Sequence, residues 1–554
     1  MGVSIKSVGI MVFSKNLDAH RPAYIDAKTT QTLTRGDVYT QSLRLAWSLR
    51  NTLKQKPGMT MAIFSPNSIT WPILLLGGIA AGLRITTINT SYTPNELRHQ
   101  LEDSGAFHIF THPTLVEIVV AALKSMKVSD IEIQNRVILL PGLIQLSNSE
   151  NKHLHFNNLL GPNQLETEES FNGSASDDTV FLCYSSGTTG KSKGVELTHH
   201  GVVSVLCLAR FRFGYINSTD AMLLSFLPFF HVYGLVKLLL SPFFAGCPQV
   251  IMSGFLPEDF CACIERYKIT VSLIVPPVLV VLANHPVSAA PIGKDLIMAV
   301  HRRWEKRGTD VKIIQGWGLT ETSPTCTAQK LEDFPAKIGS VGGLLAGLEA
   351  QLVKDNGIDD ADEGEPGEIW IKGPNVMKGY LNNPDATRNA ITPDGWLKTG
   401  DIAVVDKDGD FTILDRKKEL IKYKGFQGDC ELEIYCVFIP FIQHLIQVAP
   451  AELEDILLSH PKIVDAGVIG VWSENEATEF PRAYVVPVLT CVDRETLSKE
   501  IQIWFQSQVA RHKYLRGGVV VIDAIPKSAS GKILRKTLRE LYKAGADISS
   551  KANL

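Results

Sequence analysis

The chain has 554 residues, more than one hydrophobic core usually organises, so two or more domains are expected. Its 45% hydrophobic residues, 20% charged residues and formal net charge of -3 are typical of an ordinary soluble globular protein, and they give no reason to expect nucleic acid or an anionic membrane as a partner. The nine cysteines are scattered without a C-x-x-C pair, which favours reduced thiols over a disulfide scaffold.

The first 170 residues alternate helical patterns with short apolar runs. They predict a helix over 41–53, a strand over 59–64, a buried helix over 73–83 and a strand over 85–88. Strands alternating with helices imply a mostly parallel sheet covered on both faces. The same rhythm returns at 222–227 and 271–275. No run is a clean stretch of about 20 apolar residues, so we expect no transmembrane segment.

Residues 184–194, YSSGTTGKSKG, are the most informative segment and follow the apolar run 179–183. An apolar run that breaks into Gly and hydroxyl residues predicts a buried strand feeding a loop. The backbone N–H groups of such a loop can surround phosphate oxygens, while Lys191 and Lys193 add positive charge. The P-loop pattern fails because Ser185 stands where its first Gly must be. The other alternative, a flexible Gly/Ser linker, does not account for the lysines. The segment therefore predicts phosphate binding, with a nucleotide as ligand.

Later segments predict different architecture. Residues 367–372 and 410–414 mix polar and apolar positions, which is typical of a half-exposed antiparallel sheet. After Asp415 a smaller α+β part is predicted, with a helix over 452–459 and a strand over 483–486.

Six further motifs follow the phosphate loop in order: FFHVYG at 229–234, QGWGLTET at 315–322, GYLNNP at 379–384, GWLKTGD at 395–401, DRKKELIKYKGFQ at 415–427 and PKSASGK at 526–532. Together they resemble the adenylate-forming enzymes (acyl-CoA synthetases, luciferases and adenylation domains), most closely the 4-coumarate–CoA ligase-like acyl-CoA ligases. The resemblance covers essentially the whole chain.

The resemblance implies an α/β fold with two domains. The first, 1–415, would be a large multi-subdomain AMP-binding domain with mostly parallel sheets sandwiched by helices plus an antiparallel barrel-like part. The second, 416–554, would be a small mobile α+β domain that rotates about the hinge Lys418. The implied activity is ATP-dependent ligation of an aromatic (cinnamate-type) or fatty carboxylic acid to CoA through an acyl-adenylate, with ATP, Mg²⁺ and CoA as cofactors.

The resemblance also implies residue roles. Glu321 would hold Mg²⁺, which takes one or two carboxylates plus phosphate oxygens. Lys532 would bridge the carboxylate and the α-phosphate as negative charge develops between them. Trp317 would lie against adenine, with a plain core tryptophan as the alternative, and Asp401 would bind the ribose hydroxyls. The remaining nucleotide-binding residues would be Ser185, Ser186, Gly187, Thr188, Thr189, Gly190, Lys191, Gly316, Gly318, Thr320 and Arg416.

The second half-reaction would use residues that the small domain carries to the site. Lys422 and Gln427 match its catalytic segment, and Lys424 and Gly425 match its CoA-binding part. His231 resembles a gate between the carboxylate and thiol approaches, although a core histidine is the alternative. Tyr233 would line the substrate pocket.

Two departures from the family set this chain apart. Residues 428–447, GDCELEIYCVFIPFIQHLIQ, are an apolar insertion without counterpart, expected to adhere to the surface or to expose an apolar patch. After Val287 a segment that contains a central strand in relatives is missing, and its neighbours would be left with unpaired backbone groups. An inactive pseudoenzyme or the product of a faulty gene model is therefore one alternative function.

Luciferase-like oxidation of the adenylate is a further alternative, because it shares every motif. A stand-alone peptide-synthetase adenylation domain is disfavoured, since no carrier-protein attachment signal follows Lys536. A monomer or weak homodimer in the cytoplasm is expected. The final Ala552-Asn553-Leu554 matches the peroxisomal signal Ser-Lys-Leu poorly and leaves that location open.

Overall fold

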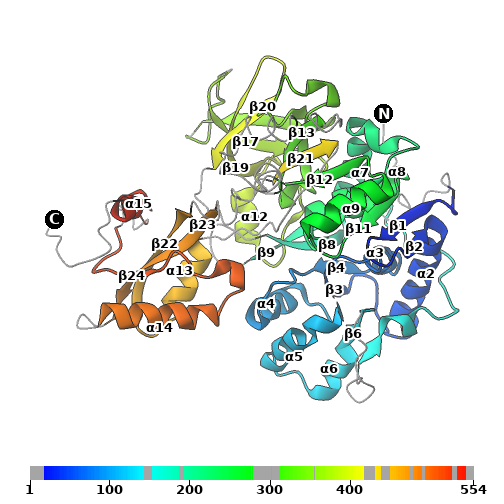
Figure 1. Cartoon of the computed structure of the whole chain (residues 1–554), viewed down its shortest axis with the longest axis horizontal. Helices are drawn as coiled ribbons and strands as arrows, with labels where there is room; N and C mark the ends of the chain where they lie inside the picture. Colours follow the sequence, from blue (N-terminus) through cyan, green and yellow to red (C-terminus); the bar gives the residue numbers. More distant parts are fainter. Residues whose placement is uncertain are drawn as a thin grey trace.

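The structure is a computed structural model. It describes residues 18–142, 153–185, 192–275, 278, 301, 312–354, 356–362, 364–416, 431–437 (backbone), 450–473, 478–488, 493–526, 533 and 535–543. Figure 1 shows a large body of sheets and helices beside a smaller one formed by the C-terminal elements. No helix within these ranges combines the length and the apolar content needed to cross a membrane.

The first large sheet has eight strands, and most of them are parallel. Its order is β18 (Gly379–Tyr380), β9 (Lys193–Thr198), β8 (Thr179–Ser185), β4 (Arg84–Thr87), β3 (Thr60–Phe64), β5 (His108–Thr111), β6 (Val137–Leu139) and β7 (Leu154–His155). Strands β8 to β7 run parallel, while β9 and β18 are antiparallel additions at one edge.

Helices cover both faces of this sheet, as the sequence predicts. The side chains of Met61 and Ile63 pack in a core with α2 (Arg35–Asn51) and α3 (Trp71–Ala80), whereas Ala62 and Phe64 pack in a separate core with other helices. Alternate residues of a strand point to opposite faces, so one strand serves both cores. All ten residues of α3 are buried, which explains its uniformly apolar sequence. The second face is covered by α4 (Pro94–Ser104), α5 (Val116–Ser125) and α6 (Asp130–Arg136).

The second large sheet has nine strands. Its order is β15 (Gly343–Leu344), β14 (Thr325–Ala328), β13 (Lys312–Gly318), β21 (Glu431–Val437), β12 (Val271–Ile274), β10 (Leu223–Ser225), β11 (Gln249–Ile251), β1 (Pro22–Asp26) and β2 (Thr32–Thr34). Around it lie α7 (His199–Arg212), a π-helix (Tyr233–Leu240), α8 (Ser241–Ala245) and α9 (Pro257–Tyr267) (Figure 1).

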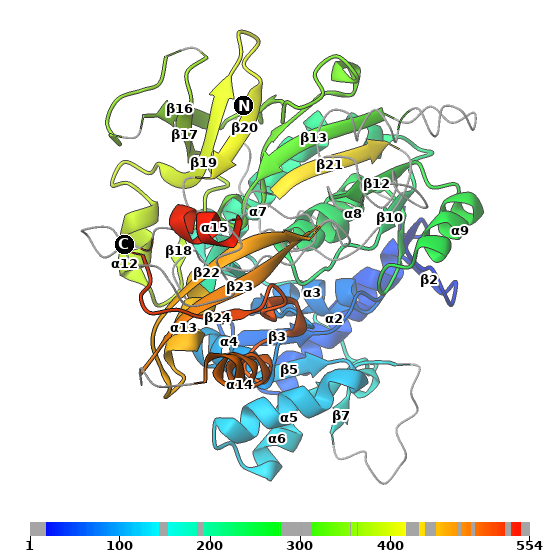
Figure 2. The same cartoon turned by 60° about the vertical axis from the view of Figure 1, so that its left-hand side comes forward.

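Strand β21 corrects the expectation for the insertion at 428–447. Residues 431–437 do not adhere to the surface of the protein but pair with two strands at once, β12 on one side and β13 on the other. Both views show β21 between these strands (Figures 1 and 2). For residues 431–437 the expectation was wrong, because an apolar composition alone does not distinguish a segment that adheres to the surface from a central strand; residues 428–430 and 438–447 lie outside the described residues.

The remaining part of the large body is a four-stranded antiparallel sheet, as predicted. It consists of β16 (Glu349–Val353), β17 (Gly367–Lys372), β19 (Leu397–Val405) and β20 (Phe411–Arg416), with α12 (Pro384–Ala390) nearby. Along β19, Leu397, Asp401 and Ala403 are buried and the other residues are partly or fully exposed, as expected for a sheet with one covered face.

The small body is an α+β unit with hydrophobic clusters of its own. Its sheet contains β22 (Ile463–Ser473), β23 (Thr478–Pro487) and β24 (Val519–Val521), with α13 (Pro450–Leu458), α14 (Arg494–Gln506) and α15 (Arg535–Lys543) packed around it (Figure 2). One ion cluster joins the two bodies: Lys513 Nζ lies 2.5 Å from Glu96 Oε1 on α4 and 2.8 Å from Glu452 Oε1 on α13. All three side chains are largely buried.

Candidate active site

The predicted phosphate loop lies at the tip of a hairpin. Strand β8 ends at Ser185 and β9 begins at Lys193, and these two residues are paired across the antiparallel ladder. The predicted strand over 179–183 is therefore confirmed and extends to the first hydroxyl residue of the loop. His99 on α4 holds the returning end of the loop, with its Nε2 2.9 Å from the carbonyl oxygen of Ser192.

Glu321 lies beside this hairpin. It belongs to a 3₁₀ turn, Thr320–Thr322, that follows β13 directly. The Ser185 hydroxyl donates to Glu321 Oε1 at 3.3 Å, and the Tyr380 hydroxyl donates to the same oxygen at 2.9 Å. Two residues that the sequence predicts for the phosphates and the metal thus meet, although 136 positions separate them in the chain.

Tyr380 is a site residue that had no role predicted from the sequence. Strand β18 pairs with β9 and sets Tyr380 opposite Val195. This pairing brings its ring to 5.2 Å from the ammonium of Lys193, within the range of a cation–π contact. Its position inside the GYLNNP motif was the available signal, but the sequence did not show which carboxylate the hydroxyl would contact.

Trp317 and Asp401 form the second polar pair of the site. The Trp317 indole N–H donates to Asp401 Oδ2 at 3.0 Å, and both residues are fully buried. The turn after Trp317 requires glycine at position 318, because a Cβ there would lie 1.6 Å from the carbonyl oxygen of Pro324. The pair is compatible with the predicted ribose and adenine roles and with the alternative of a core tryptophan.

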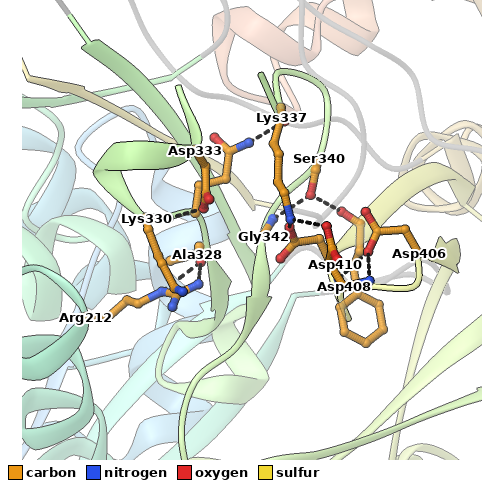
Figure 3. A network of polar contacts seen from close by, with 12 residues as sticks. Arg212, Ala328, Lys330, Asp333, Lys337, Ser340, Gly342, Asp406, Asp408 and Asp410 are labelled. Carbon is orange, nitrogen blue, oxygen red and sulfur yellow. Dashed lines mark hydrogen bonds and ion pairs between the residues drawn. The ribbon is translucent and has the colours of Figure 1, made fainter. Parts of the chain in front are cut away.

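A polar network braces the strands that carry this pair (Figure 3). The Lys337 ammonium lies 2.6 Å from Asp410 Oδ2 and 2.9 Å from Asp408 Oδ2, at the turn between β19 and β20. Hydrogen bonds to Asp408 and Asp410 raise the pKa of Lys337. Gln329 donates to the carbonyl oxygen of Lys337 and accepts from the backbone N–H of Gln315 on β13. The network therefore connects the strand of Trp317 to the hairpin of Asp401.

His231 and Tyr233 lie where the FFHVYG motif enters the π-helix that begins at Tyr233. Asn67 holds the segment in front of them: its amide donates to the carbonyl oxygen of Leu227 and its Oδ1 accepts from the N–H of Phe229, both at 2.8 Å. Burial lowers the pKa of His231 to about 4, so the imidazole is neutral at physiological pH.

The remaining predicted residues are distributed as follows. Gly316 and Gly318 lie on β13, Thr320 precedes Glu321 in its turn, and Arg416 ends β20, paired with Asp401 in the ladder. Outside the described residues lie Ser186, Gly187, Thr188, Thr189, Gly190, Lys191, Lys418, Lys422, Lys424, Gly425, Gln427 and Lys532. Their roles stay predictions.

The oxygen-rich surroundings of Glu321 fit a magnesium ion shared with a nucleotide. Mg²⁺ binds oxygen ligands and takes one or two carboxylates together with phosphate oxygens. Within the described ranges no group of three or more His, Cys, Asp or Glu side chains could hold a metal. If Glu321 holds the ion, the remaining ligands would come from the nucleotide and from water.

Fold and site together define an adenylate-forming enzyme. Two family models match the sequence: "AMP-binding enzyme" over residues 14–381 and "AMP-binding enzyme C-terminal domain" over residues 452–532. The insertion at 428–447 falls between the two matched ranges.

Named relatives specify the class further. The chain is 36% identical to 4-coumarate–CoA ligase 2 of Nicotiana tabacum over 548 residues, covering 95% of this chain and 92% of the relative. It is 34% identical to peroxisomal OPC-8:0-CoA ligase 1 of Arabidopsis thaliana over 547 residues, which cover 94% of this chain and 91% of that relative. Among solved structures, a double mutant of o-succinylbenzoate CoA synthetase from Bacillus subtilis, bound to a product analogue, is similar to this chain with a TM-score of 0.74 and 26% sequence identity. The match covers 96% of this chain and 98% of that chain.

The chain therefore belongs to the AMP-binding enzyme family and is one of its AMP-forming acyl-CoA ligases. A carboxylic acid, ATP and CoA are the substrates of that family. The predicted family, fold class and enzyme class are confirmed.

Proposed function

We propose that this protein activates an aromatic carboxylic acid as its acyl-adenylate, with release of pyrophosphate, and then transfers the acyl group to the thiol of CoA. The observation that carries the proposal is the meeting of Ser185, Tyr380 and Glu321 beside the phosphate-loop hairpin. This arrangement supplies both groups that the first half-reaction needs, donors for phosphate oxygens and a carboxylate for a cation. A solved structure of the Bacillus subtilis o-succinylbenzoate CoA synthetase with its acyl-adenylate intermediate, 25% identical to this chain, supports the two-step chemistry.

In the proposed first step, the hydroxyl of Ser185 and the loop that follows it bind the β- and γ-phosphates. Glu321 would hold Mg²⁺, which neutralises phosphate charge when bound. Asp401, fixed by the Trp317 indole, accepts hydrogen bonds from the ribose hydroxyls. Lys532 stabilises the negative charge that develops between the carboxylate and the α-phosphate. The product of the step is the acyl-adenylate, which keeps the nucleotide in place for the thiol.

In the proposed second step, the segment that contains Lys422 and Gln427 contributes to thioester formation, and Lys424 and Gly425 contact CoA. His231 separates the approaches of the carboxylate and the thiol. Since the imidazole is neutral, it adds no fixed charge to the passage.

The proposed substrate class is cinnamate-type, with fatty acids second. The 4-coumarate–CoA ligase relatives favour an aromatic acid, and Tyr233 offers an aromatic wall at the predicted pocket. The relative named as an OPC-8:0-CoA ligase supports keeping longer aliphatic acids in any panel.

The decisive experiment measures pyrophosphate release on a panel of cinnamic and fatty acids, with and without CoA. We expect release with a cinnamate-type acid and thioester formation when CoA is added. Oxygen consumption and light without thioester would indicate luciferase-like chemistry, and no pyrophosphate release from folded protein with any acid would support an inactive chain.

In Lys532→Ala, adenylation should be lost while thioester formation from preformed adenylate persists. Loss of both in folded protein would contradict the role of Lys532.

A cytoplasmic monomer or weak homodimer is the proposed state. An N-terminal fluorescent fusion would distinguish cytosol from peroxisome, and sedimentation of the purified protein would give the oligomeric state.

A further inference from the structure

The two departures that the family resemblance implies meet at one place in the structure. The position after Val287, where a segment is expected to be missing, lies in the chain between β12, which ends at Ile274, and β13, which begins at Lys312. The insertion supplies β21, and β21 lies between those two strands. A strand from the insertion thus occupies the place in the sheet between the two strands that flank the expected gap.

The pairing of β21 is continuous on both sides. All seven residues of β13 pair with it, from Lys312 opposite Val437 to Gly318 opposite Glu431. On the other side, Ser272, Leu273 and Ile274 lie opposite Cys436, Tyr435 and Ile434.

Removal of β21 would leave two open edges in the interior of the sheet. Residues on both flanking strands, including Ile274, Ile313 and Ile314, are fully buried, so water cannot readily replace the lost partners. A buried backbone donor or acceptor without a partner is strongly unfavourable. The two flanking strands would also be separated by twice the usual strand spacing and could not pair with each other without moving.

We propose that the insertion is a replacement strand: β21 comes from the C-terminal side of the chain, completes the large sheet and holds β13 in position. Because Gly316 and Trp317 lie on β13 opposite Glu433 and Leu432, β21 is a positioning element for the nucleotide site. The insertion and the shortened segment then form one compensated rearrangement rather than two independent faults.

The replacement strand also extends the large body along the chain. Strand β20 ends at Arg416 and β21 begins at Glu431, and each belongs to a sheet of the large body. The large body therefore includes residues as far along the chain as Val437, and the role of β21 in positioning the nucleotide site rests on the proposed function.

Disulfide trapping in the full-length protein tests the strand without measuring activity. Residues directly opposite each other in an antiparallel pair have Cβ atoms close enough for a disulfide. In a Ser272→Cys variant, mild oxidation should join the new thiol to Cys436, detected as a linked peptide by mass spectrometry. Leu273→Cys is the matched control, since it lies opposite Tyr435 and its side chain leaves from the other face of the sheet. No linkage in folded Ser272→Cys, or equal linkage in both variants, would overturn the proposal.

A proline scan supplies the functional readout. Proline cannot donate in a ladder and is excluded from central strands. Tyr435→Pro should lower the thermal midpoint by several degrees and reduce pyrophosphate exchange at least 10-fold. Phe441→Pro lies in the same insertion but beyond the end of β21. It should leave both the thermal midpoint and the rate of pyrophosphate exchange nearly unchanged. Equal effects of the two prolines would show that β21 is not a strand of the sheet. If the disulfide forms but neither the unchanged protein nor any variant exchanges pyrophosphate, the proposed function is contradicted while the proposed strand is supported.

Discussion

The indole N–H of Trp317 donates to Asp401 Oδ2 at 3.0 Å, linking a strand of the nine-stranded sheet to a strand of the antiparallel sheet. The bond fixes a buried carboxylate at the seam between two sheets. Asp401→Ala should weaken ATP binding by about 1.5–3 kcal/mol, because charge-assisted bonds to the ribose are lost. Isothermal titration with ATP measures the change.

Trp317→Phe separates the two members of the pair. It keeps an aromatic ring but removes the donor, so ATP affinity should fall by roughly 1 kcal/mol. If the indole acts by orienting Asp401, the two substitutions will be non-additive in a double-mutant cycle. Strictly additive losses would show that Asp401 is oriented by other groups.

Tyr380→Phe should raise the Mg²⁺ concentration required for half-maximal pyrophosphate exchange about 5-fold, which corresponds to about 1 kcal/mol, the net contribution of an ordinary hydrogen bond. The reason is that its hydroxyl donates to Glu321 Oε1. Tyr24→Phe is the control, since that buried hydroxyl donates to the carbonyl oxygen of Leu239 instead. A similar shift in both variants would indicate a general loss of stability.

Lys513→Met should destabilise the contact between the two bodies. Burial disfavours the ammonium charge, but Glu452 and Glu96 raise the pKa of Lys513 above its ordinary value, so the ion is retained. Its loss leaves two buried carboxylates without their cation, which costs about 3–5 kcal/mol. Lys462→Met is the exposed counterpart, paired with Glu500 at 2.7 Å, and should cost at most about 1 kcal/mol. Urea unfolding of both variants makes the comparison; equal midpoints would contradict it.

Three histidines with lowered pKa values, the buried His108 and His199 and the half-buried His231, predict instability in acid. Burial lowers the pKa of His108 and His231 to about 4 and that of His199 to about 3. The unfolded chain takes up protons below about pH 6.5, while the folded chain resists protonation until its own lower pKa values. Stability should therefore fall as pH drops from about 6.5 toward 4, by up to about 1.4 kcal/mol per pH unit for each histidine.

Melting temperatures between pH 7.5 and pH 5 test this. His199→Gln should flatten the slope, because the ring that stacks on Phe171 no longer titrates. A melting temperature that does not change over this range would argue against the buried neutral state.

Much of the fold could be predicted from local sequence. The apolar run of α3 and the mixed pattern of Gly367–Lys372 each carry their own signal, and the structure has both elements. The hydroxyl of Tyr380 could not be assigned a partner, because Glu321 lies 59 positions away and the contact depends on β18 joining β9. Likewise, no local pattern showed that residues 431–437 would match the gap between β12 and β13. Pairing between segments so far apart in the chain depends on the neighbouring strands that are available to pair, and not on the sequence of the segment alone.

Strand β21 also determines when the nine-stranded sheet can be completed during synthesis of the chain. In most chains the N-terminal domain can fold as soon as it has been made. Here β12 and β13 have no strand between them until β21 has been synthesised, and β21 begins at Glu431, far downstream of Ile274. At ordinary translation rates of about 5–20 residues per second, the interval is on the order of 10 s. During that time two apolar strand edges have no permanent partner, so the nascent protein should depend on chaperones and should not yield a stable fragment when truncated after Arg416.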